Sequence, residues 1–570
     1  MRLQISETKN AASFYVVKSI YENGKHSSKV VEKLGTRADL EKKLNGKDPV
    51  EWAQEYVNEL NKQEKENKRE VFVKYSPAKI IAKGKQKLFN GGYLFLQKIY
   101  HELGIDKICK IISDKYRFSF DLNCILSMLL YGRIIFPSSK LSTYEQSKTF
   151  IEQPGFKLHD IYRALDVVGN EMDFIQSEIY KNSLKVSKRN TGALYYDCTN
   201  FFFEIEQEDG LRQFAHSKEN RPNPVVGMGM FMDGDGIPLA FSIDKGNTNE
   251  QVTLKPLEKK ILSDFELSQF IVCTDAGLSS AANRKFNDKE DRAFITTQSV
   301  KKLKAHLKQW ALDAGGWHLP GEVKVFNITM LDTNKDFNKT YYKERWIKED
   351  GLEQKLIVSF SLKYQDYQRK IRDGQITRAQ KVIDSNPTKL KKVNQNDYKR
   401  FIAKTSITPD GEVADKELYR IDADLISKEA AYDGFYAVCT NLEDDTSSII
   451  DINRKRWEIE ECFRIMKSEF KARPAFLNKD NRIEAHFATC FMALILFRFL
   501  EKRVGEGHTY PDIIDTLREM NFYKIEGEGY VPIYTRTNLT DKLHDASGFR
   551  SDYEIVTNKQ MKTICKQTKH

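Results

Sequence analysis

The spacing of apolar residues predicts a helical region in the first half of the chain. Between residues 88 and 190 apolar side chains recur every three or four positions, as at Leu122, Ile125 and Leu129, which is typical of helices with one buried face. The segment 136–139 (FPSS) interrupts this series, and either serine is suited to cap the helix that follows. Such a helical region fits DNA binding as well as a purely structural bundle.

From residue 191 onward the apolar runs become short and strand-like. Three strands in succession, followed by alternating helix and strand, predict an α/β fold with a mixed five-stranded sheet flanked by helices. The predicted strands cover residues 194–205, 225–232, 237–243, 270–274 and 293–297, and the predicted helices cover 249–264 and 279–287.

Residues 300–432 do not continue this alternation. Strands at 323–326 and 356–360 and a basic helix over 364–384 predict an inserted, mainly β subdomain. The elements predicted after the insertion are a strand at 435–439, a long helix near 447–471 and a second helix over 481–503.

A small hairpin is predicted at the N-terminus. Strand-like runs at residues 13–17 and 30–34 flank Asn23-Gly24, a pair that favours tight turns. Residues 36–70 then become helical and highly charged, as expected of a solvated helix end or linker.

The composition fits a large globular protein with an excess of positive charge. Of 570 residues, 40% are hydrophobic and 30% charged, which excludes a disordered chain and predicts several domains. The 91 Lys and Arg against 81 Asp and Glu give a net charge of +10, a modest excess that suits a polyanionic partner. The eight cysteines include no Cys-x2-Cys pair, which favours buried, reduced thiols over a structural zinc site.

Membrane association is not expected. The N-terminus lacks the charged-then-apolar layout of a signal peptide. The apolar run 490–497 is shorter than the ~20 residues that a membrane span needs, so we predict a buried helix there. A soluble, cytoplasmic protein is the resulting expectation.

Two aspartates occupy positions where sheets gather ligands. Asp197 lies inside the apolar run 194–203 (LYYDCTNFFF), where a buried carboxylate needs a cation or strong donors. Asp275 directly follows the strand 270–274, at a strand end where open α/β sheets bind ligands and metals. Plainer interpretations are an edge-strand Asp that faces water and an Asp-Ala-Gly turn.

A third acidic residue, Glu460, lies on a helix between basic residues. One face of this helix is an apolar stripe, and the neighbouring face is mostly basic. The stripe consists of Ile459, Phe463, Met466 and Phe470. The neighbouring face consists of Arg456, Glu460, Arg464, Lys467 and Lys471. Ordinary ion pairing on a wet surface explains the second face equally well.

Together, a strand Asp, a strand-end Asp and a helix Glu predict a cage of hard oxygen ligands for two Mg²⁺ or Mn²⁺ ions. Two such ions, about 3.5–4 Å apart, activate the attacking oxygen and stabilise the leaving oxygen at a phosphodiester. The adjacent Arg and Lys side chains are suited to hold the flanking phosphates.

On these residues the sequence resembles the DDE transposases of bacterial insertion sequences, which have a ribonuclease-H-like catalytic domain. Three blocks carry the resemblance: YYDCT (195–199), VCTDAG (272–277) and the signature block. In the signature block Arg456, Glu460 and Lys467 match the family's Tyr-x2-Arg-x3-Glu-x6-Lys pattern. The long interval between the second Asp and the Glu fits the subgroup with a mainly β insertion.

The resemblance implies that Asp197, Asp275 and Glu460 are the catalytic residues and the ligands of two Mg²⁺ (or Mn²⁺) ions in each active site. It also implies that Arg456 and Lys467 contact DNA near the scissile phosphate. With the rest of this face, the predicted DNA-binding residues are Asn453, Arg456, Arg464, Lys467 and Lys471.

Other details of DNA handling are less closely specified. Asn453 stands where the signature has Tyr, and Asn still hydrogen-bonds a phosphate but cannot stack or span the same distance. Relatives hold a flipped base with a Trp of the insertion. The three Trp residues available for this, each equally suited to a core, are Trp310, Trp317 and Trp346. The polar loop 217–224 is either a substrate contact or an ordinary turn.

The implied activity is cut-and-paste DNA transposition of a mobile element. A magnesium-dependent endonuclease step nicks the terminal inverted repeats, and the freed 3′-hydroxyl then attacks another strand, which is a DNA recombination reaction. The implied partners are double-stranded DNA and a second copy of the chain, as a dimer in the synaptic complex, in a bacterial cytoplasm at the nucleoid. Two alternatives are a catalytically inactive DNA-binding protein derived from a transposase and a ribonuclease-H-like nuclease without strand transfer.

The pattern and the resemblance together predict six regions. They are an N-terminal hairpin and charged helix (1–70), a helical DNA-binding region (71–190), the first part of the ribonuclease-H-like core (191–299), the inserted β-rich subdomain (300–432), the second part of the core with the Glu helix (433–505) and a C-terminal region (506–570). The hairpin and the helical region are both candidates for reading the DNA ends.

Overall fold

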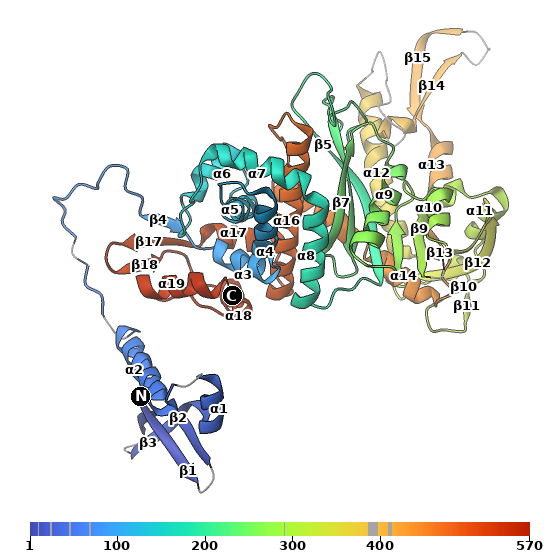
Figure 1. Cartoon of the computed structure of the whole chain (residues 1–570). Coiled ribbons are helices and arrows are strands. Elements are labelled where there is room, and N and C mark those ends of the chain that lie inside the picture. The colour runs from blue at the N-terminus through green and yellow to red at the C-terminus, as the bar shows by residue number, and fades with distance from the viewer. Residues whose placement is uncertain are drawn as a thin grey trace. The chain divides into compact units, whose positions relative to one another are not determined.

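The structure is a computed structural model, and it describes residues 1–8, 11–22, 25–44, 47–67, 70–73, 75–289, 291–385, 397–407 and 413–569. The chain forms two compact units, Met1–Lys85 and Gln86–His570, whose elements are labelled in Figure 1. The larger unit carries every residue predicted to take part in catalysis.

The N-terminal unit contains the predicted hairpin and one strand more. Its strands β1 (Arg2–Thr8), β2 (Ala11–Glu22) and β3 (Lys25–Thr36) form an antiparallel sheet, followed by α1 (Arg37–Lys43) and α2 (Pro49–Asn67). The hairpin β2–β3 is confirmed, and its predicted turn at Asn23-Gly24 lies outside the described residues. Strand β1 escaped prediction because Leu3 and Ile5 alone make too short an alternation.

The larger unit begins with a helical bundle, as the pattern of residues 88–190 predicts. Its helices are α3 (Tyr93–Glu102), α4 (Ile105–Tyr116), α5 (Leu122–Ile135), α6 (Lys140–Ser147), α7 (Leu158–Asn170) and α8 (Met172–Val186). The predicted stripe of α5 is buried, since Leu122, Ile125 and Leu129 are at most 3% exposed. Of the two candidate caps, Ser139 accepts a hydrogen bond from the Ser142 backbone N–H and begins α6.

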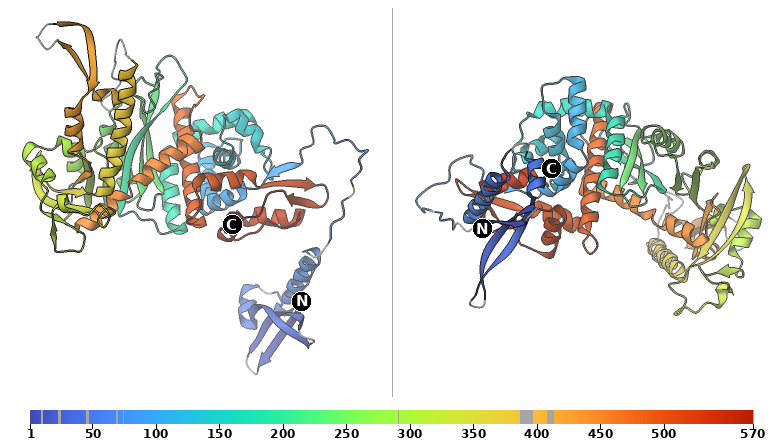
Figure 2. Two further views of the ribbon diagram at one scale, coloured as in Figure 1. Left: turned by 180° about the vertical axis from the view of Figure 1, so that it is seen from behind. Right: turned by 60° about the horizontal axis from the view of Figure 1, so that its bottom comes forward.

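Helix α16 (Asp480–Val504) runs between this bundle and the sheet, as Figures 1 and 2 show. Its length and apolar composition suit a membrane span, yet 94% of its most apolar window is buried inside the protein. It packs against α5 and α7 on one side and against strand β7 on the other. The predicted buried helix is confirmed, and it is a core element shared by both layers.

All five predicted strands are present and form one half of a large mixed sheet, with β7 at its edge. They are β5 (Ala193–Phe202), β6 (Val225–Asp233), β7 (Pro238–Lys245), β8 (Phe270–Thr274) and β9 (Arg292–Gln298). Their order in space is β7-β6-β5-β8-β9; β5, β6 and β7 are antiparallel neighbours, whereas β8 and β9 run parallel to β5. The predicted helices α9 (Glu250–Asp264) and α10 (Ala281–Phe286) make the two crossovers.

The sheet has ten strands rather than the predicted five, because four strands of the insertion and β16, the strand predicted directly after it, extend it. Strand β16 pairs with β9, and β13, β12, β10 and β11 follow outward in that order. Without them β9 is an edge with unpaired N–H and C=O groups, which the returning chain covers. The added strands are β10 (Trp317–His318), β11 (Val325–Phe326), β12 (Tyr341–Glu349), β13 (Leu352–Phe360) and β16 (Phe435–Thr440).

Other parts of the insertion stand apart from this sheet. The predicted basic helix is present as α12 (Leu362–Asp384). Strands β14 (Ile402–Ile407) and β15 (Val413–Ile421) pair only with each other, as a ribbon that projects beyond the sheet in Figures 1 and 2. Two short helices, α11 (Ala305–Leu312) and α13 (Ala423–Ala430), complete the segment. The insertion is rich in strands, as predicted, but most of them enlarge the main sheet.

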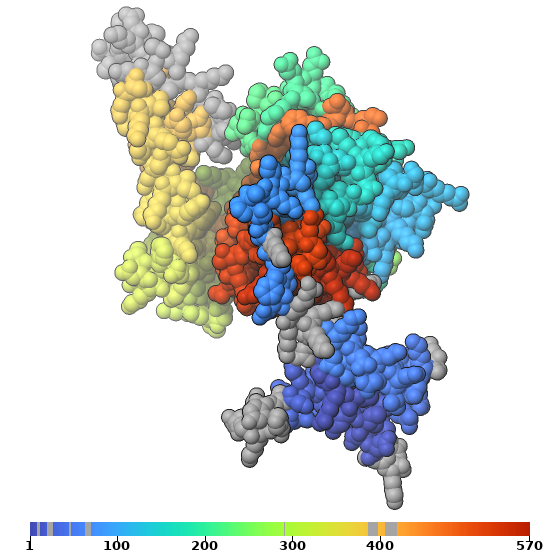
Figure 3. Space-filling view, turned by 90° about the vertical axis from the view of Figure 1, so that its left-hand side faces the viewer, coloured from blue at the N-terminus to red at the C-terminus, as the bar shows by residue number. Residues whose placement is uncertain are grey.

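The C-terminal segment returns to the start of the larger unit. Strand β4 (Leu88–Asn90) pairs with β17 (Asn521–Ile525), and β18 (Gly529–Pro532) and β19 (Val556–Thr557) complete a four-stranded sheet. Helices α17 (Tyr510–Glu519), α18 (Asn538–Ser547) and α19 (Asn558–Gln567) accompany it. In Figure 3 this red segment forms one continuous surface with the cyan helices of the bundle.

Strand β5 separates two hydrophobic cores. Tyr195 and Phe201 face the main core, which is shared with α16 and the bundle, whereas Tyr196 and Cys198 face a second core under α9. This alternation follows from the period of two residues in a strand. The cysteines are buried as predicted, apart from the half-buried Cys124.

Candidate active site

Asp197 and Asp275 lie side by side on neighbouring parallel strands. The parallel pairing of β5 with β8 places Tyr195 opposite Cys273. Asp197 is two residues further along β5, and Asp275 is two residues after Cys273, directly after the end of β8. Residues two positions apart point to the same face. The two carboxylates interact, since the negative charge of Asp275 raises the pKa of Asp197.

Burial and nearby charges together set the protonation of Asp197. Its pKa is raised to about 6, mainly by burial and in smaller part by Asp275. Lys218, the Cys198 backbone N–H, which donates to Asp197 Oδ1 at 2.8 Å, and Arg456 oppose this rise. Two adjacent carboxylates in such a place favour a bound cation, which offsets their burial and their repulsion.

The segment that carries Glu460 is not the single helix predicted over residues 447–471. It is divided into α14 (Thr446–Arg454), α15 (Trp457–Arg464) and a π-helical turn, η4 (Ile465–Glu469). Helix α14 packs against β9 and α15 against β5, and one straight helix cannot follow both strands. The predicted apolar stripe is confirmed, because all four of its residues are buried: Ile459, Phe463, Met466 and Phe470.

Arg498 on α16 fixes the position of α15. This residue is only 5% exposed, and its guanidinium pairs with Glu458 at 3.2 Å, Glu461 at 3.1 Å and Glu501 at 2.7 Å. Its Nε also donates to the carbonyl of Gly236, in the turn before β7. A buried guanidinium with three carboxylate partners has a well-defined geometry, so α15 is held against both α16 and the sheet.

Glu460 is linked to the aspartate pair through Arg456. Its side chain is 58% exposed and pairs with Arg456 at 3.3 Å, while Arg456 also lowers the pKa of Asp197. In the part of the chain that the structure describes, no three Asp, Glu, His or Cys side chains form a group suited to hold a metal ion. The structure therefore brings Asp197 and Asp275 together, whereas the third predicted ligand, Glu460, is separated from them by the side chain of Arg456.

Asn453 faces the interior of the protein. It is 7% exposed, and its Nδ2 donates to Tyr436 Oη at 3.0 Å. The Tyr436 hydroxyl also shares a hydrogen bond with Thr297 Oγ1 at 2.7 Å. Because α14 turns this position toward β16, Asn453 is not exposed to a phosphate in this conformation.

The predicted row of basic residues is interrupted at the π-helical turn. Arg464 remains exposed on α15, and Lys471 lies beyond the turn with a left-handed φ of 45°. Lys467 instead points back to β5, where its Nζ donates to Thr199 Oγ1 at 2.7 Å and lies 5.3 Å from the centre of the Phe201 ring. A π-helical turn contains one residue more than an α-helical turn, so a spacing counted for an α-helix no longer marks one face.

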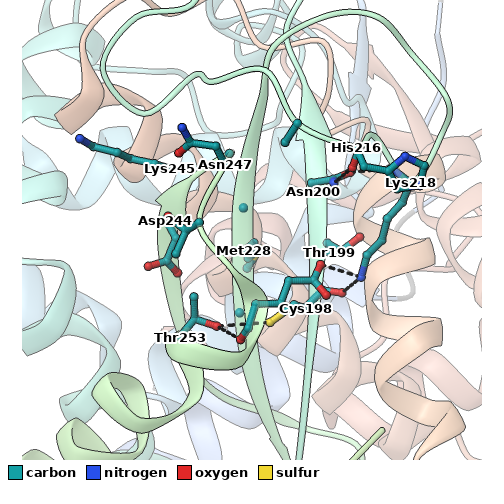
Figure 4. A pocket seen from close by; sticks show the side chains of 16 residues that line it. Cys198, Thr199, Asn200, His216, Lys218, Met228, Asp244, Lys245, Asn247 and Thr253 are labelled. Carbon is teal, nitrogen blue, oxygen red and sulfur yellow. Dashed lines mark hydrogen bonds and ion pairs between the residues drawn. The ribbon is translucent and has the colours of Figure 1, made fainter. Parts of the chain in front are cut away.

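Lys218 joins the aspartate pair to a cavity on the other face of β5. Its Nζ donates to the Cys198 carbonyl and pairs with Glu250 at 3.1 Å, as Figure 4 shows. The cavity has a volume of about 330 Å³ and is lined by residues of β5, β6 and β7, of the segment before the 217–224 loop and of the start of α9. His216 and Asn247 are among its polar residues.

Glu219, also in the 217–224 loop, connects two cations beside the site. It lies 3.6 Å from Lys467 and 2.5 Å from Arg473. Sequence reasoning flagged the loop but neither Glu219 nor Arg473, because no local motif shows a contact between residues so far apart along the chain.

The three Trp residues of the insertion differ in accessibility. Trp317 is fully buried and its Nε1 donates to the Asp313 carbonyl, so it is a core residue. Trp310 is half-buried, with Lys343 Nζ 5.2 Å from its ring centre. Trp346 is 44% exposed and is the most accessible of the three.

Known proteins identify the family. The family model described as the transposase DDE domain matches residues 207–496, slightly more than half of the chain, a span that includes Asp275 and Glu460 and begins after Asp197. No curated protein matches the chain. A cryo-EM structure of the piggyBac transposase synaptic complex with hairpin DNA is 7% identical, with a TM-score of 0.36, over 82% of this chain and 87% of that one. On the strength of the family model, this chain belongs to the DDE transposases.

Proposed function

We propose that this protein is the transposase of a bacterial insertion sequence and moves its element by cut-and-paste transposition. In this proposal it nicks DNA at the terminal inverted repeats and then joins the freed 3′-hydroxyl to target DNA. The observation that carries the proposal is the proximity of Asp197, on β5, to Asp275, directly after β8, with Arg456 near Asp197.

The strand order supports a ribonuclease-H-like catalytic core. In that fold three antiparallel strands precede two strands that run parallel to the first. Strands β5 to β9 have this order and these directions.

The aspartate pair fits a divalent cation. Carboxylate oxygens are the ligands that Mg²⁺ and Mn²⁺ prefer, and Mg²⁺ is commonly held by one or two carboxylates together with water and phosphate oxygens. The repulsion by which Asp275 raises the pKa of Asp197 is relieved when a cation binds. Glu460, now paired with Arg456, would be the third residue to hold the metal in our proposal. When bound, two such ions supply activation of the attacking oxygen and stabilisation of the leaving oxygen.

The basic side chains around the pair are proposed to position the DNA backbone. Arg456 binds a phosphate near the scissile bond when it releases Glu460, because its planar guanidinium offers two parallel donors to phosphate oxygens. Lys467, held beside β5 by its hydrogen bond to Thr199, presents its ammonium group to the neighbouring part of the DNA strand. Arg464 and Lys471 are exposed and are suited to contacts further out.

The proposed partner is double-stranded DNA, as element ends and as target, and the net charge of +10 supports a polyanionic partner. We propose a homodimer in the synaptic complex, because two element ends must be processed together. The proposed location is the bacterial cytoplasm, at the nucleoid.

Cleavage of DNA that carries the element ends tests this proposal. In Mg²⁺ or Mn²⁺, the variants Asp197→Asn, Asp275→Asn and Glu460→Gln are expected to lose cleavage by about 10³-fold or more while they retain DNA binding. Asp264→Asn, at an exposed carboxylate of α9, is the matched control and is expected to cleave normally. Undiminished cleavage by Asp197→Asn would overturn the proposal.

Strand transfer is tested separately with a pre-cut element end and target DNA. Joined products that depend on Asp197, Asp275 and Glu460 are expected. Nicking without joined products would favour a ribonuclease-H-like nuclease over a transposase.

A further inference from the structure

Two buried cations in the helical bundle have no acidic partner. Arg133 on α5 and Lys140 at the start of α6 are 4% and 7% exposed. Across the ranges that the structure describes, neither of them forms an ion pair with a carboxylate. Moving a charge out of water costs several kcal/mol, so buried cations are normally paired. A bound anion would therefore stabilise Arg133 and Lys140, because the described residues around them supply no carboxylate.

Some N–H groups of Arg133 and Lys140 are not used in hydrogen bonds within the protein. The Nζ of Lys140 contacts His486 Nδ1 at 3.4 Å. Because His486 Nε2 lies 2.8 Å from the Ala472 carbonyl, Nε2 carries the proton and Nδ1 is the acceptor for Lys140. Arg133 donates through Nη1 to the carbonyls of Phe470 and Lys471 and through Nη2 to the carbonyl of Ser138. Its buried Nε has no partner among the described residues. Two N–H groups of Lys140 and one on Nη2 of Arg133 thus remain for a ligand.

The electrostatics at Lys140 agree with a missing anion. The pKa of Lys140 is lowered to about 7, chiefly by burial and then by the charge of Arg133. The same causes hold the pKa of His486 well below its usual range, since burial, Lys140 and Arg133 all disfavour its charged form. A bound anion reverses the penalty for both basic residues.

These cations line an open pocket. It has a volume of about 230 Å³ and lies between the α5–α6 connection and the segment that follows η4. Water takes about 30 Å³ per molecule, so the pocket admits a group much larger than water. Arg473 also lines this pocket, as do Ser139, the N-cap of α6, and Lys140, its first residue. Three cationic side chains from separate parts of the chain therefore surround one space.

The pocket adjoins the candidate active site. Glu219 pairs with Arg473, which lines the pocket, and with Lys467, which is bonded to Thr199 on β5. Thr199 is two residues beyond Asp197 on the same strand. A single chain of contacts thus leads from the aspartate pair to the pocket.

We propose that Arg133, Lys140 and Arg473 form a phosphate-binding subsite, and that the phosphate belongs to the backbone of DNA that passes the active site. The second half of this proposal rests on the proposed function. Phosphate fits better than a carboxylate because its several oxygens and higher charge match donors that converge from three directions. A free phosphate compound has the same chemistry, so the two sources are separated by experiment.

The first experiment measures thermal unfolding of the full chain in phosphate and in chloride of equal ionic strength. Phosphate is expected to raise the Tm of the wild type and of Lys110→Met, a control at an exposed lysine of α4, but not that of Lys140→Met. In chloride, Lys140→Met is expected to be at least as stable as the wild type, because it removes an unpaired buried charge. An equal phosphate shift in Lys140→Met, or none in the wild type, would overturn the subsite. Lys140→Gln replaces Lys140→Met if the latter does not fold.

The second experiment identifies the source of the phosphate. The affinity for duplex DNA is measured against salt concentration, and Lys140→Met is expected to lower the slope of log K against log salt by about 0.9, the value for one phosphate contact. Lys110→Met is expected to leave the slope unchanged. An unchanged slope in Lys140→Met, with its phosphate shift lost, would overturn the DNA half and assign the site to a free phosphate compound. Neither measurement involves cleavage, so failure of the proposed function is seen separately.

Discussion

The candidate active site and the pocket at Lys140 bury charge of opposite sign in different ways. At the active site Asp197 and Asp275 are accompanied by Lys218 and Arg456, which lower the pKa of Asp197 and partly balance the carboxylates. In the pocket Arg133 and Lys140 are more deeply buried and have no carboxylate beside them. Like charges placed together mark where a ligand completes the structure. We therefore propose a cation as the ligand of the first region and an anion as the ligand of the second.

The largest effect expected from this difference is a selective response to Mg²⁺. At about 100 times its Kd, a ligand that binds only the folded state raises the free energy of unfolding by about 2.7 kcal/mol. Mg²⁺ is expected to stabilise the wild type and Lys140→Met alike, and to stabilise Asp275→Asn much less, because that variant lacks half of the aspartate pair. Thermal unfolding at constant ionic strength, with and without EDTA, measures this.

The control for the Mg²⁺ response is Asp264→Asn, which removes an exposed carboxylate of α9 and is expected to behave as the wild type. If Asp275→Asn keeps the full Mg²⁺ shift, the ion binds elsewhere and the active-site half of the comparison is wrong.

The sequence points to the candidate active site but not to the pocket, for a physical reason. Asp197 and Asp275 stand out because a carboxylate inside an apolar strand, or directly after one, is unusual. A few neighbouring residues of sequence are enough to recognise this pattern. Strands β5 to β9 were predictable on the same local grounds. What marks Arg133 and Lys140 is the absence of a carboxylate nearby, and only the packing of α5, α6 and α16 shows this.

The limits of prediction near Glu460 have the same origin. The apolar stripe from Ile459 to Phe470 was predictable because burial follows a helical spacing. The division into α14, α15 and η4 was not, since it depends on which strand each segment packs against. The ten-stranded sheet also required knowing that β16 returns to the edge of β9.

Glu219 stands between the two regions, and its removal has an intermediate expected effect. Glu219→Gln leaves Lys467 and Arg473 without their shared carboxylate, which is 22% exposed. For a partly exposed network of this kind we expect a loss of about 1–2 kcal/mol in the free energy of unfolding. The same variant is expected to bind DNA more tightly at low salt, because two cations become available to phosphates.

Denaturant unfolding and salt-dependent DNA binding measure both effects of Glu219→Gln. Glu206→Gln, at an exposed position shortly before the same loop, is the matched control and is expected to change neither. Weaker DNA binding by Glu219→Gln would show that Glu219 orients the two cations rather than neutralising them.

The pH dependence of stability should have opposite signs in the two regions. The pKa of Asp197 is raised from 3.8 to about 6, so its contribution to stability is present below about pH 4 and is lost as the pH rises through about 6. The pKa of Lys140 is lowered from 10.5 to about 7, so stability is gained as the pH rises from about 7 to about 10. Asp275→Asn is expected to reduce the loss of stability between about pH 4 and pH 6 without abolishing it, because burial of Asp197 remains the main cause of its raised pKa.

Lys140→Met is expected to abolish the gain of stability between about pH 7 and pH 10 and to leave the loss at lower pH unchanged. Denaturant unfolding in EDTA from pH 4 to pH 10 measures both, and a profile in which either variant changes the other region's pH range would mean that the two regions are not electrostatically independent.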